Sequence, residues 1–174
     1  NLGLSLFAVG LIWTIQLVHY PSMKYIPEDR FPEYHNFHSM RISILAMPLM
    51  FIEMVTSIML FYQNFSNAFH IVFFSNLIMV VLIWCSTFLI QVPLHNSLSK
   101  EKDIEKLSRL VNTNWIRTIL WTLRSVLMIL FLARNKIIKT DLKVHNIVLI
   151  QFVLTNLDNF SISFSFDNEL CNGT

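Results

Sequence analysis

The sequence predicts an all-α integral membrane protein, a polytopic four-helix bundle. Of its 174 residues, 54% are hydrophobic and only 14% are charged, whereas an average soluble domain carries about 25% charged residues. The mean hydropathy is +0.54. Four segments also approach the length of about 20 mostly apolar residues that a membrane-spanning helix needs. These segments are residues 2–18, 42–62, 71–90 and 115–132.

The composition also excludes several other classes of protein. A net charge of +2 is too balanced for a nucleic-acid binder, so we expect no nucleic-acid partner. Three glycines and five prolines are too few for a disordered or linker-rich chain. The two cysteines, Cys85 and Cys171, are far apart and form neither a disulfide framework nor a Cys-x-x-Cys metal motif. The lipid bilayer is therefore the first partner that the composition implies.

Each apolar segment has its own character. A secretory signal peptide is the alternative for the first, but residues 2–18 have neither a basic leading region nor a small-x-small cleavage site. The second segment contains Pro48 and Glu53, the third has no charge, and the fourth contains Arg117 and Arg124. We interpret all four as membrane spans.

The connections between the spans predict the topology. Residues 63–70 are a short stretch without acidic or basic side chains, so the second and third spans form an antiparallel hairpin. The longer connections, residues 21–40 and 93–114, then lie on one side of the membrane. The positive-inside rule places that side in the cytoplasm. The basic residues on that side are Lys24, Arg30, Arg41, Lys100, Lys102, Lys106 and Arg109, against Arg134, Lys136, Lys139 and Lys143 on the other.

The charged connection and the tail carry two further predictions. Residues 99–111 are amphipathic, with Ser99 as a candidate cap, and predict a short interfacial helix before the fourth span. Apolar residues alternate with polar ones over residues 160–166, which favours a hairpin or a loosely ordered tail. We therefore divide the chain into a transmembrane domain, residues 1–139, and a C-terminal tail, residues 140–174.

Two opposite charges fall deep inside the predicted spans. An ionisable side chain in hydrocarbon is costly unless it has a partner. At a rise of about 1.5 Å per residue, Glu53 lies ~18 Å along the helix from Arg41, and Arg124 lies ~14 Å from Trp115. The two depths are similar, so we expect Glu53 and Arg124 to form a buried ion pair between the second and fourth spans.

Several other polar residues should converge at one end of the bundle. The up-down topology brings together the end of the first span, the start of the second, the end of the third and the start of the fourth. Four of the six histidines lie in these places. As an alternative, each histidine alone marks only the headgroup belt, and the Glu53–Arg124 pair is only structural. The convergence of the four histidines favours a functional pocket.

Imidazole groups suit iron, copper or zinc. We therefore consider a histidine-only metal site with iron or copper, or a bis-histidine haem. Without a metal, the same histidines would act as general bases while Arg117 and Arg124 stabilise an enolate or phenolate. The candidate catalytic residues are Arg117, Arg124 and Glu53; the candidate cofactor-binding residues are Gln16, Gln91, Asn114 and Arg41; the candidate metal ligands are His19, His35, His38 and His95.

At these residues the sequence resembles a known group. The resemblance rests on four motifs: Gln16-Leu-Val-His19-Tyr-Pro21, Tyr34-His35-x-x-His38-Ser-x-Arg41, Gln91-Val-Pro93-Leu-His95-Asn96 and Asn114-Trp-Ile-Arg117-Thr-Ile-Leu-Trp121-Thr-Leu-Arg124. They look like those of small, uncharacterised four-helix bacterial membrane proteins that are distantly similar to the anthrone-oxygenase-like family. The resemblance covers about residues 13–132. It implies a four-helix membrane fold, a location in a bacterial inner membrane, and oxidation of an aromatic or quinone-like substrate.

Three functions follow as hypotheses. The first is an integral membrane oxidoreductase acting on a lipophilic aromatic or quinone-like small molecule. The second is a non-enzymatic accessory subunit of a larger membrane complex, binding a lipid or pigment. The third, a transporter, is the least favoured because the sequence shows only four spans and no inverted repeat.

Overall fold

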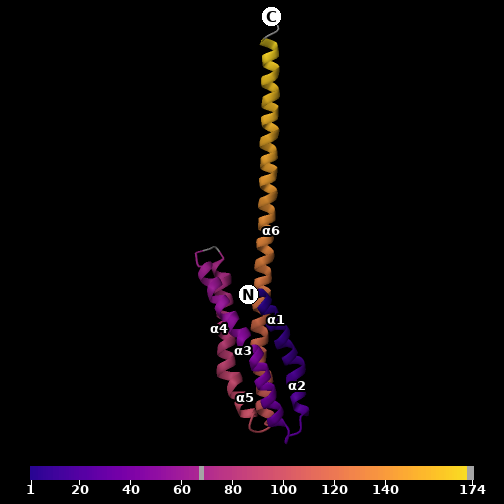
Figure 1. Cartoon of the computed structure of the whole chain (residues 1–174), viewed down its shortest axis with the longest axis vertical. Coiled ribbons are helices and arrows are strands. Elements are labelled where there is room, and N and C mark those ends of the chain that lie inside the picture. Colours follow the sequence, from indigo (N-terminus) through magenta and orange to yellow (C-terminus); the bar gives the residue numbers. More distant parts are fainter. Residues whose placement is uncertain (67–68, 172–174) are drawn as a thin grey trace. The chain divides into compact units, whose positions relative to one another are not determined.

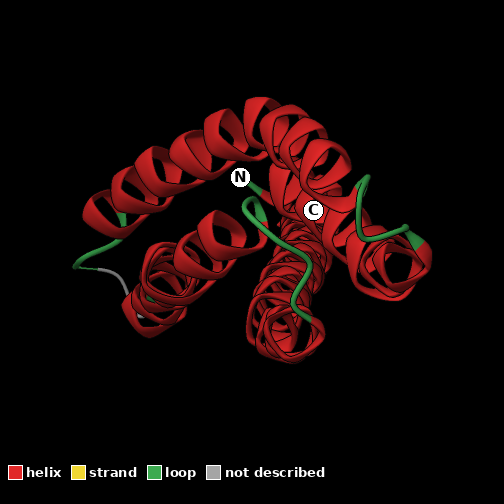
Figure 2. Cartoon of the chain, turned by 90° about the horizontal axis from the view of Figure 1, so that it is seen from below, coloured by secondary structure: helices red, strands yellow, loops and turns green. Residues whose placement is uncertain are grey.

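The structure is a computed structural model that describes residues 1–66 and 69–171, with the side chains of residues 1–66 and 69–137. Its described elements are all helical and contain no strand, so the all-α class is confirmed (Figure 2). The chain divides into two units, Asn1–Phe131 and Leu132–Thr174. The sequence analysis had drawn this boundary after residue 139. All candidate site residues belong to the first unit.

The four predicted spans are confirmed as helices that are long and apolar enough to cross a membrane. They cover Leu2–Tyr25, Phe31–Gln63, His70–Leu98 and Ile104–Ile137. The first consists of α1 (Leu2–Thr14), a π-helical turn η1 (Ile15–His19), α2 (Tyr20–Ser22) and a 3-10 turn η2 (Met23–Tyr25). The second is α3 (Phe31–Gln63). The third consists of α4 (His70–Ser86), a second π-helical turn η3 (Thr87–Gln91) and α5 (Val92–Leu98). The fourth span is the first part of the longer helix α6 (Ile104–Cys171).

The connections are shorter than the sequence predicted. Only residues 26–30 and 99–103 remain outside helices at one end of the bundle. These two loops are tied together by Lys102, whose Nζ donates to the carbonyls of Lys24 (3.0 Å) and Ile26 (2.6 Å). The helices α3 and α4 run side by side as the predicted antiparallel hairpin (Figure 1). The ends of α2 and α5 and the starts of α3 and α6 therefore meet at one end.

The predicted interfacial helix is not a separate element. Residues 104–111 form the first turns of α6 and continue into the fourth span without a break. The cap is Asp103 rather than Ser99, because Asp103 Oδ1 accepts a hydrogen bond from the Lys106 backbone N–H at 3.0 Å. Leu107 and Leu110 are buried on the predicted apolar face, whereas Ile104 is exposed. The apolar stripe therefore packs against the bundle instead of lying along the membrane surface.

The prediction of a hairpin in the tail is also wrong. Helix α6 continues through residues 160–166 and ends at Cys171. No proline occurs after Pro93, and no glycine occurs between Gly10 and Gly173. Extending an existing helix needs no new nucleation, and only glycine or proline strongly opposes it. The only turn residues directly before this segment are Asn156, Asp158 and Asn159, and these oppose a helix less strongly than glycine or proline does.

The bundle has an apolar outside and a partly polar inside. Phe51, Leu89 and Leu130 are each more than 60% exposed, as expected for side chains that face lipid tails. Glu53 and Arg124 are in contrast buried. Water-soluble proteins show the opposite distribution, because they bury apolar side chains and expose charged ones.

The two π-helical turns shape the end where the polar residues gather. Each ends two residues before a proline, η1 before Pro21 and η3 before Pro93. Proline has no N–H, so the carbonyl four residues earlier loses its α-helical partner and the helix widens locally. Such turns are frequent at functional sites. Here η1 carries Gln16 and His19, and η3 carries Gln91.

Replacing Asp103 tests the observed helix start. The backbone and side-chain hydrogen bonds from Lys106 lower the pKa of the Asp103 carboxyl below its usual value. A lowered pKa means that the charged cap contributes its stability above the unfolded-state pKa of about 4 and loses it as the pH falls through the folded-state pKa. Asp103→Ala is therefore expected to lower the thermal unfolding midpoint slightly at neutral pH, with the difference from wild type vanishing in acid. Equal midpoints for the two proteins at neutral pH would contradict this cap.

Candidate functional site

An ion pair in the middle of the bundle joins α3 to α6. Arg124 Nη1 pairs with Glu53 Oε1, as the sequence predicted, and the two side chains are 0% and 2% exposed. Three further guanidinium hydrogens are also used. Arg124 Nε donates to Asn76 Oδ1 (2.8 Å), and Nη2 donates to Asn1 Oδ1 (2.8 Å) and Ser57 Oγ (3.2 Å). The arginine thus connects α1, α3, α4 and its own helix.

The carboxylate of this pair is equally well satisfied. Glu53 Oε2 accepts from the Trp121 indole N–H at 2.8 Å, and Oε1 also accepts from Ser5 Oγ at 3.1 Å. Neither Glu53 nor Arg124 lines the cavity described below. The structure therefore does not bring these two candidate catalytic residues to the cavity. Their contacts are those of a structural link between helices.

Breaking the ion pair is expected to destabilise the protein strongly. Removing one partner of a buried pair leaves an uncompensated charge and typically costs about 3–5 kcal/mol. Glu53→Gln should therefore lower the unfolding midpoint of the detergent-solubilised protein markedly. The double variant with Arg124→Gln should lose less stability than the two single losses added together. Strictly additive losses in this double-mutant cycle would show that the two residues are not coupled.

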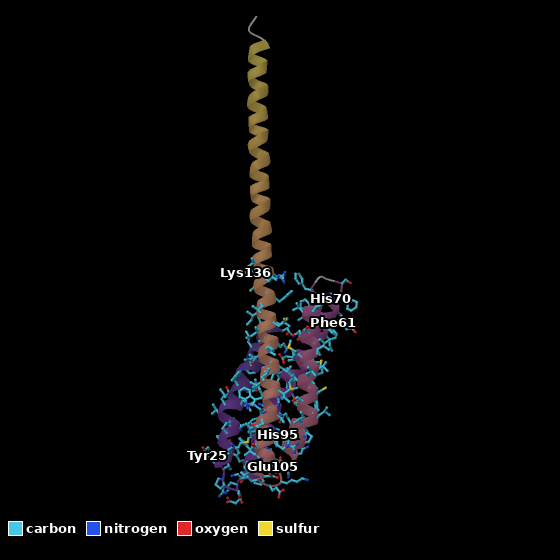
Figure 3. The ribbon with its side chains drawn as sticks, turned by 180° about the vertical axis from the view of Figure 1, so that it is seen from behind. Tyr25, Phe61, His70, His95, Glu105 and Lys136 are labelled. Carbon is cyan, nitrogen blue, oxygen red and sulfur yellow. The ribbon has the colours of Figure 1, made fainter. Side chains whose placement is uncertain are left out.

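A cavity of about 100 Å³ lies between the four spans, next to this network. Most of its wall is apolar, with Ile12, Ile42 and Met50 from two of the helices. Its polar lining is concentrated toward the end where the polar residues gather. Figure 3 shows His95 toward the end of the bundle that carries Tyr25 and Glu105, away from His70 at the other end. The polar residues of the wall are Tyr20, Ser43, Thr87, Gln91, His95 and Arg117.

Arg117 is a buried cation that forms no ion pair with an acidic side chain among residues 1–66 and 69–137. Its side chain belongs to a residue that is only 9% exposed. Its guanidinium lies over the Trp121 ring, 5.2 Å from the centroid. Its Nε is buried and has no hydrogen-bond partner within the described part of the chain. An unpaired buried charge costs free energy, so this residue needs an explanation that the fold alone does not supply.

Gln91 presents an unsatisfied acceptor at the same cavity. Its Nε2 donates to Thr113 Oγ1 at 3.0 Å. Thr113 Oγ1 in turn donates to the Arg109 carbonyl at 2.6 Å, which fixes the amide orientation of Gln91. Gln91 Oε1 is buried and has no hydrogen-bond partner among the described side chains. Arg117 and Gln91, the residues that carry this donor and this acceptor, therefore both line one cavity.

The other candidate cofactor-binding residues lie elsewhere. Asn114 Nδ2 donates to Gln16 Oε1 at 2.7 Å, and Gln16 Nε2 donates to the Val111 carbonyl at 3.1 Å. Neither side chain lines the cavity, and together they link α6 to η1. Arg41 is exposed, with its guanidinium 5.3 Å from the centroid of the Phe37 ring. Only Gln91 of this predicted set reaches the cavity.

The four candidate metal ligands lie at one end of the bundle, but as two separate pairs. His95 Nδ1 lies 3.1 Å from His35 Nε2. The rings of His19 and His38 are stacked with their centroids 3.8 Å apart. The Nε2 atoms of both rings are buried and have no hydrogen-bond partner among the described residues. His95 is the only one of the four that lines the cavity.

This arrangement does not fit the expected metal or haem site. Within residues 1–66 and 69–137 no group of three or more His, Cys, Asp or Glu side chains is placed so that it could hold a metal ion. His95 Nδ1 and His35 Nε2 instead share a hydrogen bond, and no third ligand of these kinds is grouped with them among the described residues. A cavity of about 100 Å³ is also smaller than a porphyrin.

The structure places at the site two residues to which the sequence analysis gave no role there. The Tyr20 hydroxyl lies in the cavity wall, 3.3 Å from His95 Nε2. Ser99 Oγ lies 3.2 Å from His35 Nδ1. The adjacent His19-Tyr20-Pro21 sequence was a signal for Tyr20. No local pattern marks Ser99, because its partner is 64 residues away.

Comparison with protein-family models, with curated proteins and with solved structures finds no match to this chain. The geometry of the cavity is therefore the basis for inferring a function.

Replacing Arg117 by an apolar residue is expected to leave the ligand-free protein at least as stable as wild type. Arg117→Met removes a buried charge that has no counter-ion and keeps most of the side-chain volume. The unfolding midpoint should stay the same or rise, in contrast to the loss expected for Glu53→Gln. A large decrease would show that Arg117 stabilises the fold and would weaken the argument for a ligand.

Proposed function

We propose that the protein is an integral membrane oxidoreductase that binds a lipophilic phenol or quinone-like molecule in the cavity between its four spans. The supporting observation is a pair of unsatisfied groups, the Arg117 Nε donor and the Gln91 Oε1 acceptor, on two residues that line this cavity. A neutral phenolic hydroxyl donates its hydrogen to an amide oxygen and at the same time accepts a hydrogen bond from a guanidinium N–H. Buried polar groups of a native protein normally have partners, so a ligand with such an oxygen accounts for both.

The size of the cavity restricts the ligand. At about 100 Å³ it is smaller than the engineered apolar cavity of about 150 Å³ that takes up benzene. It therefore favours one aromatic ring as a head group over a rigid system of three fused rings. Any isoprenoid or alkyl tail would extend out of the cavity.

The cavity has a side toward the bilayer. Met47 on α3 and Val92 on α5 belong to its wall, and both are more than a third exposed on the bundle. A lipophilic ligand is concentrated in the membrane, and this side gives it a route that avoids water. Ser43 on the wall is exposed as well, and the remaining lining residues are buried or half-buried.

The proposed reaction is the oxidation of a hydroquinone by dioxygen. The hydroquinone loses two electrons and two protons and becomes the quinone, while dioxygen gains both and becomes hydrogen peroxide. Arg117 favours the phenolate, which is oxidised more readily than the neutral phenol. We name dioxygen as the oxidant because of the resemblance to oxygenase-like proteins. Under the positive-inside rule the loops 26–30 and 99–103 face the cytoplasm of a bacterium.

Binding of 4-nitrophenol tests the site directly, because its phenolate has a visible absorption band that its neutral form lacks. The wild-type protein in nanodiscs is expected to bind the phenolate. Arg117→Gln should weaken this binding about 10- to 100-fold, the usual range for one charge-assisted hydrogen bond. Arg109→Gln is the matched control, because Arg109 lies on the same helix and is exposed. Equal affinities for wild type and Arg117→Gln would refute the proposal.

Oxygen consumption with a single-ring hydroquinone then separates the two remaining functions. Hydrogen peroxide formed in a one-to-one ratio with quinone supports the oxidoreductase. Tight binding of the phenol without any turnover favours the alternative, a non-enzymatic accessory subunit of a membrane complex that holds a lipid or pigment.

A further inference from the structure

We infer that Tyr20, His95, His35 and Ser99 form a proton relay between the cavity and the aqueous phase beside the loop of residues 99–103. This inference rests on the proposed function, because it assigns a path to the proton of the bound phenol. It goes beyond that function by naming residues outside the cavity that serve it.

The four residues form a continuous chain of hydrogen bonds. The Tyr20 hydroxyl is 3.3 Å from His95 Nε2. His95 Nδ1 is 3.1 Å from His35 Nε2, and His35 Nδ1 is 3.2 Å from Ser99 Oγ. Tyr20 and His95 line the cavity, whereas His35 is fully buried behind them. The chain thus leads from the cavity wall through the protein to Ser99.

The direction of these hydrogen bonds follows from Ser99. Its hydroxyl donates to the His95 carbonyl at 2.9 Å, so its oxygen must accept from His35 Nδ1–H. A neutral imidazole has one N–H and one bare nitrogen. His35 Nε2 therefore accepts from His95 Nδ1–H, and His95 Nε2 accepts from the Tyr20 hydroxyl. Every group donates toward Ser99.

The outer end of the chain lies at the surface of the bundle. Ser99 follows the end of α5 and is partly exposed, as the first residue of the loop 99–103. Its carbonyl accepts from Asn36 Nδ2 at 3.4 Å, and Asn36 is exposed on α3. Water at the membrane face can therefore exchange protons with Ser99, but Tyr20, which is 3% exposed, depends on the chain.

The relay moves one proton without any change of oxidation state. The phenol gives its proton to the Tyr20 oxygen, while Tyr20 gives its own to His95 Nε2. His95 Nδ1 passes its proton to His35 Nε2, His35 Nδ1 passes its proton to Ser99 Oγ, and the Ser99 hydroxyl proton leaves to water. Both rings end in their other neutral tautomer. A proton transfer in the reverse direction, from water to the reduced dioxygen in the cavity, restores the starting tautomers.

Other titratable groups surround the relay. Arg117 from α6 and His19 from η1 are close enough to His95 to interact with it electrostatically, and so is His38 from α3. His95 Nδ1 also lies 3.3 Å from Ser39 Oγ, which is a second acceptor for the same N–H. Among the described side chains, His19 and His38 form no hydrogen bond with the four residues of the relay. His38 is consequently a matched control for His35.

A stopped-flow pH jump tests the relay with bound 4-nitrophenol. The rate at which the bound phenol exchanges its proton with water is read from its visible band. His35→Gln keeps a polar side chain but cannot change tautomer, and it should slow the exchange at least tenfold without changing the affinity. Ser99→Ala is a milder change at a partly exposed residue and should also slow it. His38→Gln should leave the rate unchanged. Wild-type rates in both His35→Gln and Ser99→Ala would overturn the relay and leave the proposed binding site intact.

Nuclear magnetic resonance of the ligand-free protein tests the relay without relying on the phenol. With ¹⁵N-labelled histidine in nanodiscs, both His35 and His95 are expected as neutral rings with the proton on Nδ1. Either ring carrying its proton on Nε2 instead would break the direction of the chain and refute the relay. Failure of 4-nitrophenol to bind, with the expected tautomers present, would instead refute the proposed function.

Discussion

The ion pair of Glu53 and Arg124 lies among four apolar helices, where neither charge has water as an alternative partner. Each charge must therefore be satisfied by the bundle itself. Arg124 reaches α1 through Asn1 and α4 through Asn76, while Glu53 holds α6 a second time through Trp121. Apolar surfaces alone would not select one rotation of these helices, because lipid tails are as apolar as the helices. The pair fixes which faces meet, and the cavity exists because they meet this way.

Arg117 lies seven residues before Arg124 on the same helix face, yet the two arginines have opposite surroundings. Arg124 uses its guanidinium hydrogens on four protein partners. The Arg117 guanidinium lies over the Trp121 ring, and its Nε–H has no hydrogen-bond partner among the described residues. Burying a charge costs free energy at both positions. Protein partners offset this cost at Arg124 but not at Arg117, so the two arginines need different explanations. At Arg124 the charge stabilises the bundle, whereas at Arg117 it remains available to a ligand.

Sequence reasoning predicted the features that depend on local pattern or on depth in the membrane. The four spans follow from apolar length, and the Glu53–Arg124 pair follows from matching depth. The separate interfacial helix and the tail hairpin were wrong because neither stretch contains a residue that stops a helix. The pairing of His35 with His95 and the reach of Ser99 depend on side-chain direction across helices 60 residues apart. Spacing within one helix holds no information about these contacts, and so it suggested one four-histidine cluster where the structure has two pairs.

Trp121 connects the closed network with the open cavity. Its indole N–H donates to Glu53 at 2.8 Å, so the ring plane is set by the ion pair. Its face lies under the Arg117 guanidinium and forms part of the cavity wall. A cation over an aromatic ring gains about 0.5–1 kcal/mol at exposed sites and about 2 kcal/mol when desolvated, which offsets part of the cost of burying Arg117 without neutralising it. The structural ion pair thereby holds the aromatic surface on which the second arginine rests. That arginine can keep its charge for a ligand because an aromatic ring, and not a carboxylate, supports it.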